Sequence, residues 1–505
     1  MLYLGGQMKK HFQKIISSNL FFFLIVALIN FAFRIPFLDA RGLWHDEAFS
    51  LFNSQHNWGH IKHVSEWDPN PPLYFYFLWI WRNFFGDSEF AIRISSVIFT
   101  SIAGGYLFLL VKKHFSLRSS FFASAFYLFS NLAYYYSHEA RPYGLIILLS
   151  LLSTGVFFII IDKPTWRWGI LLGLLNFLLV YTHYLAAWIL VSQFFVIVFI
   201  SSRVRWNAWL WSTLISALLI LLRFTIKTWN LIFYGGAGVV HWLKFPDSDA
   251  IFQTISSFFN SPVLMYMLAT LLLLSLFSHF QTNCISILKK TPAPKILFLF
   301  FSGVGTFPAF LILSNITPVF LDRYMIFALL PTYILIAQIF EQSTLPAFIA
   351  NAIVCVFAVI SLLILNFDPP KPMNYKDLCA VVIRMQDKKT AIVVQSKDLG
   401  ALFSYYYDRT SFRNRAALDS MLEIKNVFID KSFNEIIQIK KRRFPRIILV
   451  QSYVKGDGMR KQLKNIFSNE ITLTWFAGAN VFYYFNIPKA KIETEVRNPK
   501  ILSEY

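Results

Sequence analysis

Charged residues are scarce in this chain. Asp, Glu, Lys and Arg together make up 15% of the 505 residues, whereas apolar residues make up 56% and Phe alone occupies 55 positions. Soluble globular proteins carry about 25% charged residues. So few charges cannot cover a chain of this length with polar surface. The composition therefore excludes an ordinary water-soluble globule and predicts that lipid is the main solvent.

Cysteine is also scarce, and common signatures of nucleotide and metal chemistry are missing. The three cysteines, Cys284, Cys355 and Cys379, match no disulfide framework or metal-site spacing. The sequence has no glycine-rich phosphate-binding loop and no HExxH zinc motif. These absences argue against ATP or a nucleotide sugar as a substrate. No decisive set of metal ligands stands out, so a requirement for a divalent metal is left open.

Acidic residues are the scarcer charge sign, with 27 Asp and Glu against 47 Lys and Arg and a formal net charge of +20. A basic balance can indicate nucleic acid. Here many basic residues lie in short loops between apolar runs, and others lie in the C-terminal segment, without forming a stripe. We therefore expect no nucleic-acid partner, because basic loops between spans are typical of the cytoplasmic side of a membrane protein.

Long apolar runs are abundant. A membrane-spanning helix needs about 20 mostly apolar residues. The first run follows a basic start and is too long for a signal peptide, so we expect a signal anchor with a cytoplasmic N-terminus. Eleven spans are predicted, at 19–38, 89–111, 119–137, 143–161, 169–183, 185–201, 208–223, 251–279, 296–314, 323–340 and 345–366. Of these, 169–183 is short, and 251–279 is long and interrupted by Pro262.

The aromatic stretch Pro71–Phe85 decides the orientation of the later loops. At 15 residues it is short for a span. If it lies on the membrane surface, Lys and Arg are more than twice as dense in the inner segments as in the outer ones, as expected for a protein with basic cytoplasmic loops. We therefore interpret it as an interfacial helix. The loop 39–88 then lies outside the cytoplasm.

The composition changes after residue 366. A linker is indicated at Asp368–Pro372. The apolar runs 391–394, 447–450 and 471–487 predict strands, and 432–441 predicts a helix between two of them. The sequence thus predicts a membrane domain at 1–366 and a small extracytoplasmic α/β domain at 367–505.

Two groups of chemically active side chains occur in the first external loop. Asp46 and Glu47 are adjacent carboxylates just after a membrane helix, where charge is costly and usually functional. A solvated helix cap at Asp46 explains them equally well. Further on, Asp68 precedes Pro71, Pro72 and Tyr74, which indicates a rigid helix entry.

The other external turns add acid, base and cation. His138, Glu139 and Arg141 lie together between two spans, either as part of a cavity or as a salt bridge at the lipid headgroups. Arg323 begins a later span, where Arg suits bidentate phosphate binding or snorkelling. His183 lies in another external turn. Orientation places all of these on the same face of the membrane.

The order of these motifs resembles that of the GT-C glycosyltransferases. The bacterial branch related to protein O-mannosyltransferases (glycosyltransferase family 39) and to the lipid A aminoarabinose and galacturonic acid transferases is the most similar. The residues that carry the resemblance are Trp44, Asp46 and Glu47; Asp68 with Pro71–Tyr74; Phe85–Arg93; Ser137–Tyr143; and Arg323 with Tyr324.

This resemblance implies a multi-spanning GT-C fold in the plasma membrane and a polyprenyl-phosphate-linked monosaccharide as the donor. The sugar would pass, with inversion, to a hydroxyl of a lipid, glycan or protein acceptor outside the cytoplasm. Asp46 would act as the catalytic carboxylate, with Glu47 and Glu139 as its acidic companions. His138 and Arg141 would line the same cavity, and Arg323 would hold the donor phosphate. Further candidate substrate-binding residues are Lys62, Pro71, Tyr74, His183 and Tyr324.

Other functions remain open from the residues alone. The main alternative is a transporter or flippase of lipid-linked sugars, although no repeated halves are visible in the sequence. A non-catalytic scaffold and a polymerase or ligase that uses a lipid diphosphate are further alternatives. The glycine-containing loop 223–250 has no assigned role.

Overall fold

The fold of the chain is given by a computed structural model. It describes residues 18–55, 58–64, 68, 70–200, 203–221, 245–282, 293–342, 347–365, 367, 375–395, 397–441, 444–452, 458–467, 469–476 and 479–485. Two sequence features, most of the loop 223–250 and the linker at 368–372, lie outside these residues. The chain forms two compact units. The bundle unit comprises Met1–Leu38 and His56–Phe367, and the α/β unit comprises Asp39–Gln55 and Asp368–Tyr505.

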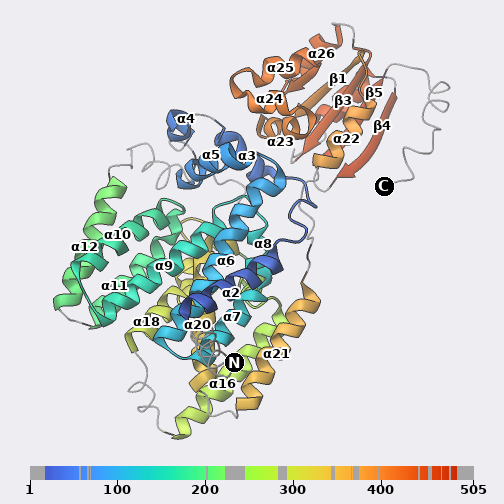
Figure 1. Ribbon diagram of the computed structural model, residues 1–505. Coiled ribbons are helices and arrows are strands. Elements are labelled where there is room, and N and C mark those ends of the chain that lie inside the picture. Colours follow the sequence, from blue (N-terminus) through green and yellow to red (C-terminus); the bar gives the residue numbers. More distant parts are fainter. Residues whose placement is uncertain are drawn as a thin grey trace, which may run out of the picture. The chain divides into compact units, whose positions relative to one another are not determined.

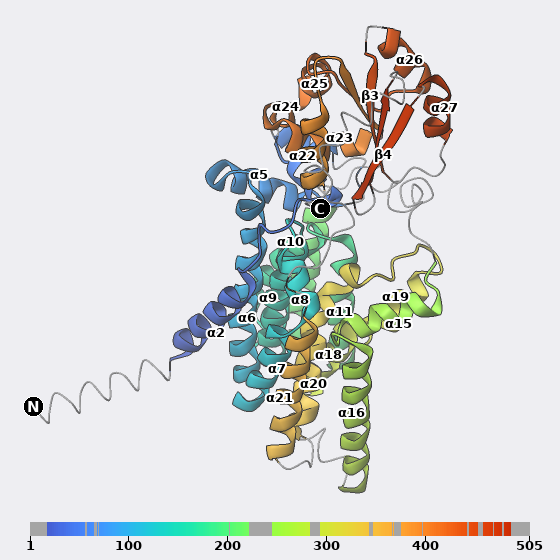
Figure 2. The same ribbon diagram turned by 90° about the vertical axis from the view of Figure 1, so that its right-hand side faces the viewer.

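The bundle unit is helical throughout its described part (Figures 1 and 2). Its first helices are α2 (Asn19–Arg34), α4 (Trp58–Val64), α5 (Leu73–Phe85), α6 (Glu89–His114), α7 (Leu117–Leu128), α8 (Asn131–Ser137), α9 (Tyr143–Asp162) and α10 (Trp166–Val180). Next come the 3-10 helix η1 (Tyr184–Ala187), α11 (Trp188–Ile200), α12 (Arg203–Leu221), α15 (Ser248–Ser257) and α16 (Pro262–Thr282). The last are α18 (Ala293–Ser302), α19 (Thr306–Leu313), the 3-10 helix η2 (Asp322–Ala328), α20 (Leu329–Gln342) and α21 (Ala347–Ile364).

Helices occupy all eleven predicted spans, which confirms a polytopic membrane bundle. Four helical stretches are long and apolar enough to cross a membrane, namely Glu89–His114, Tyr143–Asp162, Ala293–Leu313 and Asp322–Gln342. Three predicted spans are broken in the middle. The breaks fall between α7 and α8, between α15 and α16, and between α18 and α19. The stretch Pro71–Phe85 contains α5, whose 13 residues are fewer than a span requires.

Hydroxyl side chains define several helix starts. Ser88 and Ser130 each accept a hydrogen bond from the backbone N–H three residues later, which satisfies a donor that the helix leaves unpaired. Small residues bring neighbouring helices close together. Gly169 and Gly173 lie one turn apart on α10, and a Cβ at either position would meet a backbone carbonyl oxygen of α12 within 3 Å. This close approach is a small-residue helix contact of the kind found in membranes.

Two of the breaks between helices are joined by a half-buried asparagine. Asn260 lies between α15 and α16 with a φ of 66°, a left-handed conformation that Asn tolerates better than most residues. Its amide nitrogen donates to the carbonyl oxygen of Phe129 (2.8 Å) and to the hydroxyl of Ser361 (2.7 Å). Its Oδ1 accepts from the backbone N–H of Asn131 (2.8 Å). One side chain therefore joins the α7–α8 break, the α15–α16 break and α21.

The α/β unit contains a five-stranded sheet in the order β2-β1-β3-β5-β4. Strands β1, β2 and β3 are parallel, whereas β5 runs antiparallel to β3 and β4. The predicted strands and the helix at 432–441 are confirmed, and β2 is an addition. The bounds are α3 (His45–Asn53), α22 (Tyr375–Met385), β1 (Thr390–Gln395), α23 (Lys397–Tyr407), α24 (Arg409–Arg413), the 3-10 helix η3 (Arg415–Ala417) and α25 (Leu418–Ile424). They continue with β2 (Val427–Ile429), α26 (Phe433–Lys441), β3 (Arg446–Ser452), α27 (Gly458–Ile466), β4 (Asn469–Phe476) and β5 (Ala479–Phe485).

The sheet is buried on both faces at its centre. The consecutive residues Ile392 and Val393 of β1 point to opposite faces, and both are fully buried. Val393 packs in one cluster with Ile436 of α26 and Leu463 of α27. Helices α22 and α23 contact strands β4 and β1. This layered arrangement explains why β1 and β3 form continuous apolar runs in the sequence.

Candidate functional site

The acidic pair lies in the first turn of α3, in the α/β unit. The helix begins at His45 and its N-cap is Trp44, so Asp46 is not the N-cap that the sequence alternative placed there. The capping carboxylate is instead that of Glu47, whose Oε2 accepts a hydrogen bond from the backbone N–H of Trp44 (3.3 Å). Glu47 is fully buried, whereas 28% of the Asp46 side chain is exposed. Of the two carboxylates, Asp46 is the one that solvent reaches.

Asp46 has an adjacent imidazole. Nδ1 of His45 lies 3.4 Å from Oδ1 of Asp46, and the His45 side chain is 32% exposed. The N-terminal turn of a helix favours negative charge, because its backbone N–H groups carry partial positive charge. Asp46 is thus placed where an ionised carboxylate is stabilised.

Helix α3 is held at both ends by the C-terminal part of the α/β unit. Before the helix, the backbone N–H of Leu43 donates to the hydroxyl of Tyr406 on α23. At its end, Nη1 of Arg415 donates to Oδ1 of Asn53 (2.6 Å), and the guanidinium lies over the Phe52 ring at 5.0 Å. These contacts fix the helix that carries Asp46 on the sheet domain.

In the bundle unit, the turn between α8 and α9 places three predicted residues in the interior. His138, Glu139 and Arg141 are 1%, 1% and 6% exposed. The hydroxyl of Ser96 on α6 donates to the carbonyl oxygen of Glu139 (2.6 Å), which fixes the backbone of this turn. The His138 Nε2 lies 2.7 Å from the carbonyl oxygen of Arg34, at the end of α2. Their burial argues against a salt bridge exposed at the headgroups.

Arg323 begins the stretch that η2 and α20 form. The neighbouring Asp322 carboxylate accepts hydrogen bonds from the hydroxyl of Tyr136 (2.9 Å) and from the Arg323 backbone N–H (2.6 Å). The Arg323 guanidinium lies 5.4 Å from the centre of the Tyr324 ring, and the His183 ring lies 5.5 Å from the same ring. Arg323, Tyr324 and His183 are therefore neighbours.

The pKa of His183 reflects its burial and the positive charge around it. Burial, together with the positive charges of Arg141 and Arg323, lowers this pKa to about 4. The side chain is 6% exposed, and its buried Nδ1 finds no hydrogen-bond partner among the described residues. Arg141, His183 and Arg323, called here the arginine–histidine cluster, thus bring two guanidinium groups to a buried imidazole; Arg141 is buried and Arg323 is half-buried. Glu139 and Arg323 both lie within electrostatic reach of Tyr136.

The entry to α5 joins the same end of the bundle. The buried Asp68 carboxylate accepts from the backbone and side-chain nitrogens of Asn70 at 2.7 and 2.8 Å, and it lies within electrostatic reach of Tyr184. The backbone N–H of Leu73 donates to the carbonyl oxygen of Tyr181 (3.3 Å). The proline motif is therefore attached to the turn that carries His183.

The remaining candidate residues from the sequence differ in how far they are buried. Pro71 and Tyr74 are buried at the start of α5, whereas Lys62 is exposed on α4. Sequence reasoning did not select Asp322 or Tyr136. Asp322 precedes Arg323 directly, and an acidic residue beside a span start was an available signal. Nothing in the sequence indicates that Tyr136 pairs with a residue 186 positions later.

Metal binding finds no support in the part of the chain that the structure describes. No group of three or more His, Cys, Asp or Glu side chains there lies close enough to share an ion. The pair of His45 and Asp46 offers two ligands at most, which is fewer than protein sites for divalent ions normally use. We derive no chemical step through a metal.

Comparison with known proteins gives a family-model match over part of the chain and a shared fold. Residues 69–229 match the family model described as dolichyl-phosphate-mannose-protein mannosyltransferase. No curated protein matches the chain significantly in sequence.

Solved structures share the fold across most of the chain. ArnT from Cupriavidus metallidurans bound to undecaprenyl phosphate is 12% identical with a TM-score of 0.56, over 92% of this chain and 98% of that one. The oligosaccharyltransferase of Archaeoglobus fulgidus, in a structure tethered to an acceptor peptide, is 12% identical with a TM-score of 0.52, over 87% of this chain and 70% of that one. At such identities the likeness establishes the fold.

Proposed function

We propose that the chain is a member of the GT-C superfamily and an inverting glycosyltransferase that uses a polyprenyl-phosphate-linked monosaccharide. The sugar passes to an acceptor hydroxyl on the non-cytoplasmic face of the plasma membrane. The matched family model is that of a mannosyltransferase with a lipid-phosphate donor, and the ArnT structure contains undecaprenyl phosphate. Both support a lipid monophosphate as the carrier.

The observation that carries this proposal is the arginine–histidine cluster. Two guanidinium groups fit phosphate oxygens bidentately. His183 is neutral near pH 7 because its pKa is about 4, so it donates one hydrogen bond without adding a third charge. With the proton on Nδ1, this nitrogen provides a donor for a phosphate oxygen. Two guanidinium groups and a neutral imidazole, gathered at one end of the bundle, supply hydrogen-bond donors of the kind that a phosphate group needs.

The proposed reaction is a single displacement. Asp46 accepts the proton of the acceptor hydroxyl as its oxygen forms a bond to the anomeric carbon of the sugar. The bond between that carbon and the phosphate oxygen breaks, and the electron pair leaves with the polyprenyl phosphate. The arginine–histidine cluster stabilises the negative charge that develops on the phosphate. One displacement inverts the anomeric configuration.

Glu139 has a supporting part in this scheme. It is buried near Tyr136 and close to the cationic groups, so its carboxylate limits their net charge and orients them. His138 and Tyr74 contribute to the walls of the same end of the bundle. Lys62, exposed on α4, is a candidate contact for the acceptor.

The test is a transfer assay on purified protein with polyprenyl-phosphate monosaccharides labelled in the sugar. We expect free polyprenyl phosphate and labelled acceptor in equal amounts, and a raised KM for the donor in Arg323→Gln. Arg167→Gln, which removes an exposed charge at the other end of α10, serves as the matched control. Intact donor that crosses a vesicle membrane without losing its sugar would instead establish a flippase.

A further inference from the structure

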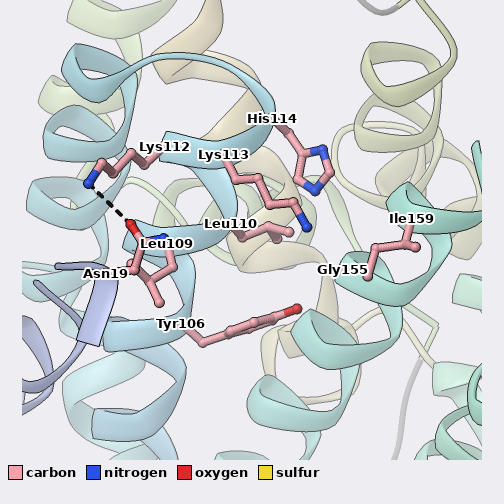
Figure 3. A pocket seen from close by; sticks show the side chains of 9 residues that line it. All are labelled: Asn19, Tyr106, Leu109, Leu110, Lys112, Lys113, His114, Gly155 and Ile159. Atoms are coloured by element: carbon pink, nitrogen blue, oxygen red, sulfur yellow. Dashed lines mark hydrogen bonds between the residues drawn. The ribbon is translucent and has the colours of Figure 1, made fainter. Parts of the chain in front are cut away.

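A second cationic site lies at the opposite end of the bundle unit from the arginine–histidine cluster. At this end, called the basic end, α6 and α9 finish and α10 and α12 begin. A pocket of about 330 Å³ opens there between α6 and α9, beside the start of α2. Figure 3 shows lysine side chains above the pocket and an aromatic ring across its lower part. Its polar rim comprises Asn19, Lys112, Lys113 and His114, and its apolar wall includes Leu110 and Ile159.

Among the described residues, no carboxylate forms an ion pair with the two rim lysines, whereas the rim residue His114 lies 3.4 Å from the Asp162 carboxylate. Lys112 donates to the side-chain oxygen of Asn19 (3.3 Å) and lies over the Phe22 ring at 4.2 Å, but it forms no ion pair with a described residue. Lys113 likewise makes no ion pair within the described part of the chain. The nearby carboxylate of Asp162 is taken by Lys295, whose Nζ lies 2.7 Å from it. Two ammonium groups are therefore left to attract an anion.

The lower part of the pocket is amphipathic. The Tyr106 ring forms part of the wall, and its hydroxyl points to Gly155 on α9 (Figure 3). A Cβ at position 155 would lie 2.0 Å from that hydroxyl, so glycine leaves the room that the tyrosine occupies. A polar rim above apolar walls suits a ligand with a charged head and a hydrocarbon part. A free phosphate ion would use only the rim.

We propose that this pocket binds the phosphate headgroup of an anionic phospholipid. The source of the ligand follows from the basic end itself. Arg205 donates to the carbonyl oxygen of Ile161, and Lys295 pairs with the next residue, Asp162, so both basic residues lie at the end of α9. Basic residues gather at the cytoplasmic side of membrane proteins, where the leaflet is rich in anionic lipid, and basic pockets between helices there bind such headgroups. The site is distinct from the proposed donor site, which lies at the other end.

The experiment is native mass spectrometry of the full chain released from nanodiscs that contain phosphatidylcholine and phosphatidylglycerol in equal amounts. We expect the wild type to retain phosphatidylglycerol selectively. In the double variant Lys112→Gln/Lys113→Gln, the preference for phosphatidylglycerol should be about 10- to 30-fold weaker. Each lysine near an anionic membrane surface strengthens binding roughly fivefold. The control is Lys163→Gln/Arg167→Gln, which removes two exposed charges from the same end outside the pocket.

Three results would overturn the proposal. Equal retention by the rim variant and the wild type would remove the lysines from any such site. An equal loss in the control would reduce the effect to general surface charge. Displacement of the lipid by millimolar inorganic phosphate would show a simple anion site. Sugar transfer, measured in neutral detergent, is an independent readout, so failure of the lipid site and failure of the proposed activity are distinguishable.

Discussion

Asp46 and Glu47 are adjacent in sequence, yet the first turn of α3 gives their carboxylates different surroundings. Glu47 points back to the backbone N–H of Trp44 and is fully buried, whereas Asp46 is partly exposed beside His45. A carboxylate that closes a helix start contributes stability. A carboxylate that solvent reaches can meet an acceptor hydroxyl. We therefore propose a structural role for Glu47 and a chemical role for Asp46.

Replacement of Glu47 should affect stability more than chemistry. We expect Glu47→Ala to lower the free energy of unfolding by about 1 kcal/mol through loss of the cap, with additional cost from the cavity. Thermal unfolding in detergent measures this loss. The donor KM should stay within about twofold of the wild type in the folded fraction. A stable Glu47→Ala protein with no transfer activity would contradict the division of roles.

His183 should make the protein sensitive to acid. Its pKa is about 4 in the folded chain and about 6.5 when unfolded, so below pH 6.5 the unfolded chain binds the extra proton. The free energy of unfolding is therefore highest above pH 6.5. It decreases by up to about 3 kcal/mol as the pH falls toward 4. We expect the melting temperature of the His183→Gln protein to fall less between pH 7 and pH 4 than that of the wild type. Identical pH profiles would refute the assignment.

At the scale of elements, the contact between α3 and the C-terminal part of the α/β unit is the most consequential. Arg415 contacts the end of α3 through a hydrogen bond to Asn53 and a cation–π contact with Phe52. We expect Arg415→Ala to lower kcat by roughly 10- to 100-fold, since small misplacements of a catalytic group are costly. The donor KM should change little, and Arg415→Lys should restore part of the rate.

Arg446→Ala is the matched control for this prediction. It removes another arginine of the same unit, whose ion pair with Asp387 is largely exposed and contributes little. If both variants lose the same activity, the loss reflects general damage to the sheet domain. A normal kcat in Arg415→Ala would show that α3 needs no such support.

Asn260 is the corresponding joint of the bundle unit. Its three half-buried side-chain hydrogen bonds connect two helix breaks and α21, and each contributes on the order of 1 kcal/mol. We expect Asn260→Ala to destabilise the protein by about 2–4 kcal/mol. Asn315→Ala, which removes an exposed amide bonded only within its own helix end, should have almost no effect. Thermal unfolding of both variants measures this difference. Equal melting temperatures for Asn260→Ala and Asn315→Ala would contradict the account.

At the scale of the whole molecule, the sequence predicts the parts that local patterns determine. Apolar runs of about 20 residues locate the eleven helical stretches, and runs such as 391–394 locate the central strands. The interruption of 251–279 at Pro262 is confirmed, but the breaks within 119–137 and 296–314 were missed. The turn at Asn260 itself depends on partners more than 100 residues away. The assignment of 39–55 to the α/β unit was also beyond the sequence, since Arg415 lies 362 residues from Asn53.

The candidate site follows the same division. Arg141, His183 and Arg323 were selected because charge and imidazole in external turns are unusual between spans, and the structure brings these three together. The different roles of Asp46 and Glu47 were not predictable, because they depend on where α3 begins. Tyr136 and Asp322 needed the folded chain to reveal their pairing.

The most direct test of the central claim compares the wild type with Asp46→Asn in sugar transfer from a polyprenyl-phosphate donor. The substitution keeps the size of the side chain and removes its basicity. The account predicts that kcat falls by about 10²- to 10⁴-fold while the affinity for polyprenyl phosphate is unchanged, because the base acts on the acceptor and the cluster holds the donor. An Asp46→Asn protein that transfers sugar at the wild-type rate would contradict the account.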